Sequence, residues 1–240
     1  MSDDESHEYE SHDYEADTGD RHTRRLSRLL IGGSLAAVLA AVTVFAALMW
    51  PSSSAAAVPR KDSVDAGFAR DMAVHHQQAV ELSFIVRDRT DDEDVRRLAY
   101  DVINTQANQR GMLLGWLDVW GLPKSSQQPY MSWMDHDMSG MEGMDGMKGM
   151  DYKAHDGSLM PGMATNRQMD QLRRAKGKAA EILYLQLLTA HHKGGIAMSE
   201  SAAGMAKTEE VRRLAQGMVE GQQAEIQLMA DMLKARGAKA

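Results

Sequence analysis

Two pairs of adjacent histidines are the residues whose type and spacing point most directly to chemistry. His75 and His76 lie within "MAVHHQQAV", and His191 and His192 lie within "LTAHHKGGIAM". The whole chain has nine histidines, so these two pairs hold almost half of them. Imidazole is the commonest metal ligand among protein side chains, and the two pairs are therefore a candidate metal site.

Methionines accompany both pairs. Met72 precedes the first pair by three residues, which on a helix places its sulfur on the same face, and Met198 follows the second pair. A set of imidazoles and thioethers is typical of copper sites and favours Cu(I) over Cu(II). The alternative is that the histidines are buried core residues hydrogen-bonded to Gln106, Gln222 or Glu225. We favour the metal, because four histidines in two equivalent stretches have methionine neighbours.

Glu225 lies with Gln222 on the apolar stripe of the last predicted helix, so its carboxylate is expected to be buried and to need a partner. It could bind the metal directly, or pair with Arg97 or Arg213. It could also accept a hydrogen bond from a ligand histidine and so fix which ring nitrogen carries the proton. We favour the last of these roles.

The second candidate metal region is the methionine-rich segment Met131–Met163, which holds nine of the 19 methionines. Its glycines and acidic residues prevent a stable apolar helix, so the segment is predicted to be flexible and to lie outside the core. Thioethers in such a polar segment are explained if they capture copper; a low-complexity linker or a sink for oxidants is the alternative. The candidate ligands are Met131, Met134, His136, Met138, Met141, Met144, Met147, Met150 and His155.

Composition limits the fold and the partners. The chain has 240 residues, a formal net charge of −7 and no cysteine. The acidic balance gives no reason to expect nucleic acid as a partner, and without cysteine no disulfide or thiolate site can form. Helix-forming residues dominate and there are only five prolines, which predicts an all-α protein. The sequence contains no Ser/His/Asp set and no phosphate-binding glycine loop, so we expect a protein that is not an enzyme.

The histidine pairs must be positioned by helices, and the chain repeats itself at a constant spacing. His191 follows His75 by 116 residues, and "VRRLA" occurs at 95–99 and again at 211–215, with the same spacing. Such an ungapped repeat predicts two helical hairpins, at about 62–120 and 167–237, that pack as a four-helix bundle. Helix starts are predicted at Thr90 and Thr208, and one helix is predicted from about 167 to 206.

The composition changes several times along the chain. The predicted parts are a disordered acidic cytoplasmic tail (1–28), a transmembrane helix (29–50), a linker (51–61) and the bundle domain (62–237), which contains the flexible insert at about 122–166. Three arginines precede the apolar span, which predicts a cytoplasmic N-terminus and an extracytoplasmic C-terminal domain. A cleaved signal segment that ends near Ala57 is the alternative.

The pattern around the histidine pairs resembles that of a ferritin-like family of bacterial exported and membrane-anchored proteins, known as domain of unknown function 305. The family pattern is close to M-x-x-H-H-x-x-A-x-x-M, followed by Q-x-x-E-I-x-x-M. The matching residues are Met72, His75, His76, Ala79, His191, His192, Met198, Gln222, Glu225, Ile226 and Met229. The chain departs from the pattern at Leu82, Gln109, Arg110 and Leu188.

This resemblance implies a ferritin-like four-helix bundle, and a link to copper that some members of the family share. The insert in turn resembles the methionine-rich segments of exported copper-handling proteins. A ferritin-like fold also suggests a di-iron oxidase, but that chemistry requires Glu-x-x-His on two helices. Met72 and Leu188 occupy the positions three residues before His75 and His191, so the sequence argues against a di-iron enzyme.

These observations predict a membrane-anchored extracytoplasmic copper-binding protein that serves copper buffering or tolerance. Its expected partners are the metal ion and the membrane, the latter through one N-terminal helix, with a second copy of the chain or a copper-transfer protein as further candidates. The alternative is an interaction or adaptor bundle on the membrane surface that binds no metal.

Overall fold

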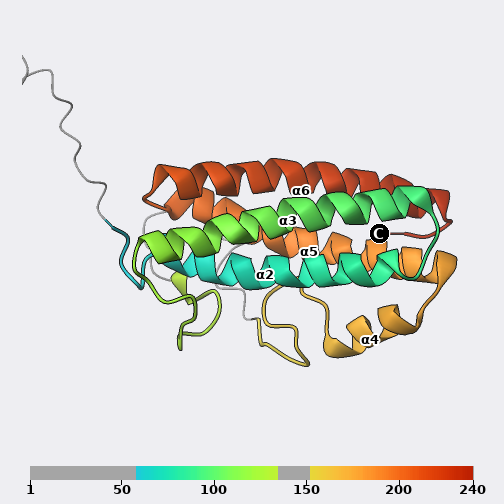
Figure 1. The fold of residues 1–240 in the computed structure, drawn as a ribbon, viewed down its shortest axis with the longest axis horizontal. Coiled ribbons are helices and arrows are strands. Elements are labelled where there is room, and N and C mark those ends of the chain that lie inside the picture. The colour runs from blue at the N-terminus through green and yellow to red at the C-terminus, as the bar shows by residue number, and fades with distance from the viewer. Residues whose placement is uncertain (1–57, 135–151, 240) are drawn as a thin grey trace, which may run out of the picture. The chain divides into compact units, whose positions relative to one another are not determined.

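The computed structural model describes residues 58–134 and 152–239, and the described part is helical (Figure 1). Four long helices run side by side: α2 (Val64–Arg87), α3 (Glu93–Val119), α5 (Gly177–Met205) and α6 (Glu209–Ala235). The connection between α3 and α5 contains a short 3₁₀ helix, η1 (Ser132–Met134), and α4 (Asn166–Arg174). These two described ranges contain no β-strand, and the all-α prediction is confirmed for them.

The predicted tail and transmembrane helix, together with residues 51–57 of the predicted linker, lie outside the described residues. In the described ranges no helix is both long and apolar enough to cross a membrane. The membrane anchor at 29–50 therefore stays a prediction.

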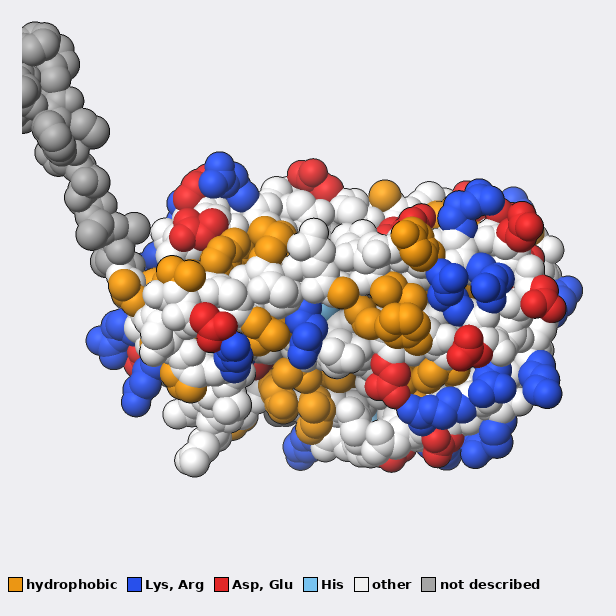
Figure 2. All heavy atoms as spheres, viewed as in Figure 1, with side chains coloured by type: hydrophobic (Ala, Val, Ile, Leu, Met, Phe, Trp, Pro, Cys, Tyr) orange, Lys and Arg blue, Asp and Glu red, His pale blue; other side chains and the backbone are white. Residues whose placement is uncertain are grey.

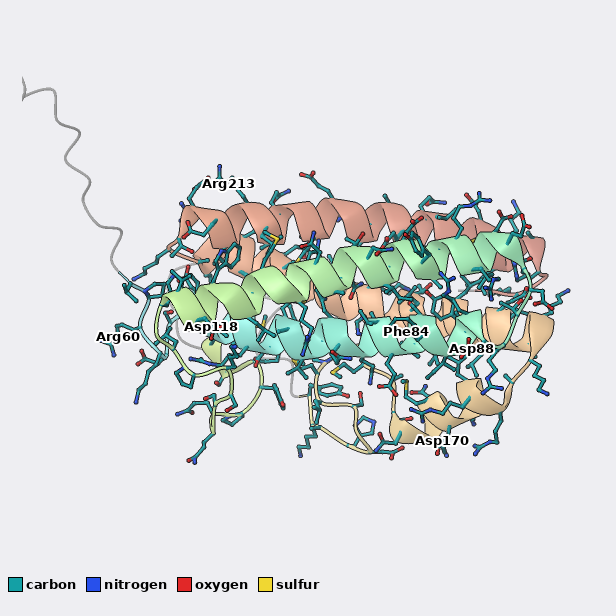
Figure 3. All side chains as sticks on the ribbon, viewed as in Figure 1. Arg60, Phe84, Asp88, Asp118, Asp170 and Arg213 are labelled. Atoms are coloured by element: carbon teal, nitrogen blue, oxygen red, sulfur yellow. The ribbon has the colours of Figure 1, made fainter. Side chains whose placement is uncertain are left out.

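Side-chain caps begin the two helices of the first hairpin. The Ser63 hydroxyl accepts a hydrogen bond from the Ala66 N–H at 3.2 Å, and the Asp92 carboxylate accepts one from the Val95 N–H at 3.0 Å. The predicted start at Thr90 is therefore two residues too early. Asp88, which follows α2, and Asp118, near the end of α3, lie at opposite ends of the bundle in Figure 3, as an antiparallel hairpin requires.

Carboxylates at repeat-equivalent positions, Asp65 and Glu181, each join one hairpin to the other. Asp65, in the first turn of α2, accepts hydrogen bonds from the Thr208 N–H and hydroxyl, both at 2.8 Å, where α6 begins. Glu181, near the start of α5, accepts a hydrogen bond from the Thr90 hydroxyl at 2.6 Å, just before α3 begins. Asp65 and Glu181 are separated by the same spacing as His75 and His191.

The prediction of one helix from about 167 to 206 is wrong. The chain leaves the helical conformation at Ala175 and Lys176 and begins α5 at Gly177, which has a φ of 50°. The Gly177 N–H donates a hydrogen bond to the Arg89 carbonyl oxygen at 2.7 Å, in the turn after α2. A tertiary bond and a left-handed glycine thus divide a segment whose residues favour helix.

The buried core consists of two hydrophobic clusters, one toward each end of the bundle. Cluster 1 includes Leu82, Val86, Tyr184, Leu188 and Leu233. Cluster 2 includes Phe68, Met72, Leu113, Met198 and Met218. The buried residues that lie between the two clusters include both histidine pairs, Gln106 and Gln222.

Candidate metal centre

A layer of buried histidines separates the two hydrophobic clusters. The side chains of His75, His76, His191 and His192 are each at most 1% exposed, and we call this set the histidine layer. The His75 and His191 rings lie almost face to face, with centroids 3.8 Å apart and an interplanar angle of 32°. The expectation that the two pairs meet inside the bundle is therefore confirmed. Figure 2 shows a face on which charged side chains crowd the end that carries α4 and only slivers of histidine reach the surface.

Two members of the layer donate from Nε2 to side chains of the neighbouring helix. His76 Nε2 is 2.8 Å from Gln109 Oε1, and His192 Nε2 is 2.6 Å from Glu225 Oε2. The two bonds are equivalent, because Gln109 and Glu225 have the spacing of the repeat. The expected hydrogen bond from a histidine to Glu225 is therefore present, whereas the Glu225 side chain is 26% exposed and not buried as predicted. Whether Glu225 also binds an ion directly is untested.

The other two members donate to backbone oxygens. His191 Nε2 donates to the His75 carbonyl oxygen at 3.0 Å. His75 Nε2 donates over a longer distance, 3.4 Å, to the Pro161 carbonyl oxygen. Because every acceptor in the layer is an oxygen without a proton, all four rings carry their hydrogen on Nε2.

The second ring nitrogens have no hydrogen-bond partner. The Nδ1 atoms of all four histidines are buried and unbonded in the structure. Burial is the main cause that lowers the pKa of His75 to about 4 and that of His76 to about 3, and it holds the pKa of His191 well below its ordinary value. These three rings are therefore neutral at pH 7, with a lone pair on Nδ1, which is the form in which imidazole binds a metal.

Buried nitrogens without a hydrogen-bond partner destabilise a fold, so four of them in one layer need an explanation. A buried polar atom without a partner costs about 1–3 kcal/mol. Four such atoms in one layer fit a metal ion, because each Nε2–H is held by an oxygen while Nδ1 stays free to bind, the arrangement common around metal-bound histidines. The residues of the layer therefore suit a transition-metal ion.

Imidazoles and carboxylates alone do not complete a site in this conformation. Across 58–134 and 152–239, no three side chains of the His, Cys, Asp and Glu types are grouped so that they could hold one ion. An ion bound at the layer would therefore need ligands of another type, or a rearrangement of the rings. Two glutamine oxygens, those of Gln106 and Gln222, are also buried there without a partner.

The predicted methionine ligands of the bundle lie in the adjoining core. Met72 and Met198 are fully buried in cluster 2, next to the histidine layer along α2 and α5. The two arginines considered as partners for Glu225 form ion pairs elsewhere, Arg97 with Asp94 and Arg213 with Glu209. That alternative for Glu225 is therefore wrong.

The structure describes both ends of the methionine-rich segment, residues 131–134 and 152–163, but not residues 135–151. His136, Met138, Met141, Met144, Met147 and Met150 lie outside the described residues. His155 is exposed, and its Nδ1–H donates to the Lys153 carbonyl oxygen at 2.9 Å. Met131 and Met134 are half-buried against cluster 2. Their roles as copper ligands are untested.

Both ends of the segment are part of the core, which corrects the prediction that it lies outside. Trp133 is 4% exposed and Met160 and Met163 are 0% and 9% exposed. Asp71 on α2 fixes the first end by accepting hydrogen bonds from the Met131 N–H at 2.7 Å and the Trp133 ring N–H at 2.9 Å. The sequence pattern missed this because the tertiary contacts come from α2, about 60 residues away.

The sequence places Gln109 where the family pattern has a glutamate, but it predicted no role for Gln109 and did not identify Pro161; the oxygens of both accept from the layer. No signal in the sequence identifies Pro161, since a backbone oxygen is placed by the path of the chain alone.

Several solved structures share this fold. A Streptomyces coelicolor DUF305 protein proposed to be secreted is 55% identical, with a TM-score of 0.65, and the match covers 75% of this chain and 98% of that one. A DUF305 fragment from Deinococcus radiodurans is 26% identical, with a TM-score of 0.55 and coverage of 72% and 96%. CopM in its Cu(I)-bound form is 16% identical, with a TM-score of 0.52 and coverage of 71% and 96%.

CopM has also been solved in Cu(II)-bound and Ag-bound forms. No curated protein matches the sequence significantly. The sequence matches the family described as domain of unknown function (DUF305) over residues 65–233, most of the chain. This chain therefore belongs to the DUF305 family.

Proposed function

We propose that this protein binds copper at the histidine layer and serves copper buffering or tolerance outside the cytoplasm. The observation that carries the proposal is the set of four buried Nδ1 atoms without a partner. Each of these rings has its Nε2–H held by an oxygen, which orients the free nitrogen, and burial keeps His75, His76 and His191 neutral.

Copper fits these donors better than other metals. Neutral imidazoles with the thioethers of Met72 and Met198 nearby form a soft set, which favours Cu(I) over Cu(II) and disfavours iron. The structures of CopM with Cu(I), Cu(II) and Ag support the same choice, because CopM has this fold. Glu225 would serve by holding His192, and the methionines of the segment 131–163 would capture further ions.

The proposed location is outside the cytoplasm, with residues 29–50 as a membrane anchor. The Streptomyces coelicolor relative, proposed to be secreted, supports export. Binding rather than catalysis is proposed because the layer is closed to solvent, so a substrate would not reach an ion there.

The test is a Cu(I) titration of the full-length protein in competition with a coloured Cu(I) chelator. The double variant His75→Ala with His191→Ala should lose the tightest equivalent of copper. The control His155→Ala, which removes an exposed histidine, should keep it. Unchanged copper binding in the double variant, together with a large loss of metal-free stability, would show that the histidines are structural and would favour the adaptor alternative.

A further inference from the structure

A short segment that follows the undescribed residues lies directly on the histidine layer. We call residues 158–164, with the sequence SLMPGMA, the strap. In Figure 1 the strap is part of the connection that leads into α4. Its Pro161 carbonyl oxygen is the acceptor for His75 Nε2. The strap is therefore the one connection that reaches into the layer in the described part of the chain.

Two glycines allow the strap to touch the backbone of α5. A Cβ atom at Gly194 would lie 2.0 Å from the Pro161 carbonyl oxygen. A Cβ atom at Gly162, where φ is 80°, would lie 2.4 Å from the Ala190 carbonyl oxygen and 3.1 Å from His191 Cα. Neither contact tolerates a side chain, so the strap lies flat against the helix at the second histidine pair.

Hydrogen bonds hold the strap in place. The Gln78 side chain, one turn after His75, donates to the Ala164 carbonyl oxygen at 2.9 Å and accepts from the Ala164 N–H at 2.6 Å. The Ser158 hydroxyl donates to the Met163 carbonyl oxygen at 2.5 Å. The strap is therefore held in a defined position against the histidine layer.

The strap breaks the symmetry of the two hairpins at His75. His191 Nε2 donates to the His75 carbonyl oxygen, and the equivalent bond would join His75 Nε2 to the His191 carbonyl oxygen. Instead His75 donates to Pro161. The layer thus has one half closed by helices alone and another half closed by the strap.

The strap also carries two buried methionines, Met160 and Met163. Met160 and Met163 flank the residue that bonds His75, and both are buried in cluster 2 with Met72 and Met198. The sulfur of Met218, another member of the cluster, accepts a hydrogen bond from the Ser199 hydroxyl at 3.7 Å. Within the described residues no hydrogen-bond donor contacts the sulfur of Met160 or Met163.

We propose that Met160 and Met163 bind the ion together with His75, and that the site therefore takes a soft monovalent cation, Cu(I) or Ag(I). This inference rests on the proposed function, and it supplies the ligands that imidazoles and carboxylates alone do not provide. Thioethers are uncharged and soft, so they stabilise Cu(I) and Ag(I) and add little for Zn²⁺.

The direct test uses the full-length protein with ¹³C-labelled methionine methyl groups, titrated with Ag(I) as a probe that undergoes no redox change. The methyl signals of Met160 and Met163, assigned with Met160→Leu and Met163→Leu, should shift by saturation. Those of Met169 and Met232, buried in cluster 1, should not shift. Unshifted Met160 and Met163 signals at saturation overturn the proposal, whichever other methionines respond.

The affinity test compares two double variants. Met160→Leu with Met163→Leu should weaken the tightest Ag(I) or Cu(I) equivalent more than about tenfold. Met169→Leu with Met232→Leu should leave it unchanged, and leucine is close enough in volume to keep both variants folded. If the strap variant binds like this control while His75→Ala with His191→Ala loses the site, only the strap proposal fails. If all three variants bind as the wild type does, the proposed function fails too.

A third variant displaces the strap without removing any ligand. Gly194→Ala places a methyl group against the Pro161 oxygen and should weaken Ag(I) binding. Gly204→Ala is the matched control, because a Cβ there meets nothing within 4 Å on the same helix. Equal Ag(I) affinity of the two folded variants would contradict a role for the strap. If Gly194→Ala does not fold, the methionine variants decide.

Discussion

At the scale of single residues, hydrogen bonds decide which ring nitrogen of each histidine is free to bind a metal ion. Each histidine of the layer is bonded through Nε2 to an oxygen, and its Nδ1 has no hydrogen-bond partner. His76 and His192 use the equivalent acceptors Gln109 and Glu225, one neutral and one a carboxylate. The chemistry of the layer thus depends as much on its acceptors as on the histidines.

Acid should destabilise the metal-free protein. The pKa of His75 is about 4 and that of His76 about 3, both lowered by burial from 6.5, so the unfolded chain binds more protons below pH 6.5. The stability contributed by these histidines is complete above pH 6.5 and is lost as the pH falls toward 4. At about 1.4 kcal/mol per pKa unit, His75 alone accounts for roughly 3 kcal/mol.

Urea denaturation of the chelator-treated protein between pH 7 and pH 4.5 measures this effect. The variant His75→Gln with His76→Gln should show a smaller loss of unfolding free energy over that range than the wild type. Asp71, whose pKa burial raises to about 6, contributes with the opposite sign, but it is present in both proteins and cancels in the comparison. If the unfolding free energies of the two proteins fell in parallel with pH, His75 and His76 would not change protonation on unfolding.

At the scale of the elements, one glycine divides what the residues would otherwise form as a single helix. Gly177 adopts a φ of 50° and begins α5 through its bond to Arg89, while α4 turns away. Because of this break, α4 belongs to the same connection as the strap and not to α5. Gly177 can be compared with a glycine inside α6, whose backbone is helical.

The same substitution should have opposite effects at two glycines. Gly177→Ala places a side chain at positive φ and should lower the unfolding free energy by about 1 kcal/mol. Gly217→Ala, inside α6, should raise it by about 0.5–1 kcal/mol, because alanine favours helix. A Cβ meets nothing within 4 Å at either position, so packing does not differ. Thermal unfolding of both variants checks the signs, and equal shifts would contradict the backbone argument.

At the scale of the whole molecule, the methionine-rich segment is fastened at both ends to one helix. Asp71 holds its first end and Gln78 its second, and these residues lie on either side of His75 along α2. The segment therefore ends beside the histidine layer and begins about one helical turn away from it, at Asp71. Its ends and its middle should consequently contribute differently to copper binding.

Two deletions should separate these contributions. Replacing residues 135–151 with a short Gly/Ser linker should lower the number of copper ions bound and spare the tightest one, since it removes methionines but keeps the strap. Deleting residues 131–163 should lose the tightest ion as well, because Met160, Pro161 and Met163 go with it. Copper stoichiometry and affinity of the two full-length deletion variants measure this. Equal loss in both would place the tight site in the removed middle.

Local patterns in the sequence determined the helices and their duplication. The spacing of His75 and His191, the repeated "VRRLA" and the apolar stripes predicted two hairpins whose histidine pairs meet, because helix periodicity is local and the repeat appears when the two halves of the sequence are aligned. The same offset places Gln109 at the position equivalent to Glu225. These features need no knowledge of the path of the chain.

The tertiary structure alone decided which atoms of the layer are free and what covers them. The Pro161 oxygen reaches His75 because the chain returns across α5 over two glycines, and Asp71 draws Trp133 into the core. The helix break at Gly177 likewise depends on a bond to Arg89. Each of these contacts joins residues far apart in the chain, and their free energy depends on backbone atoms placed by the fold, which residue types and spacing do not encode.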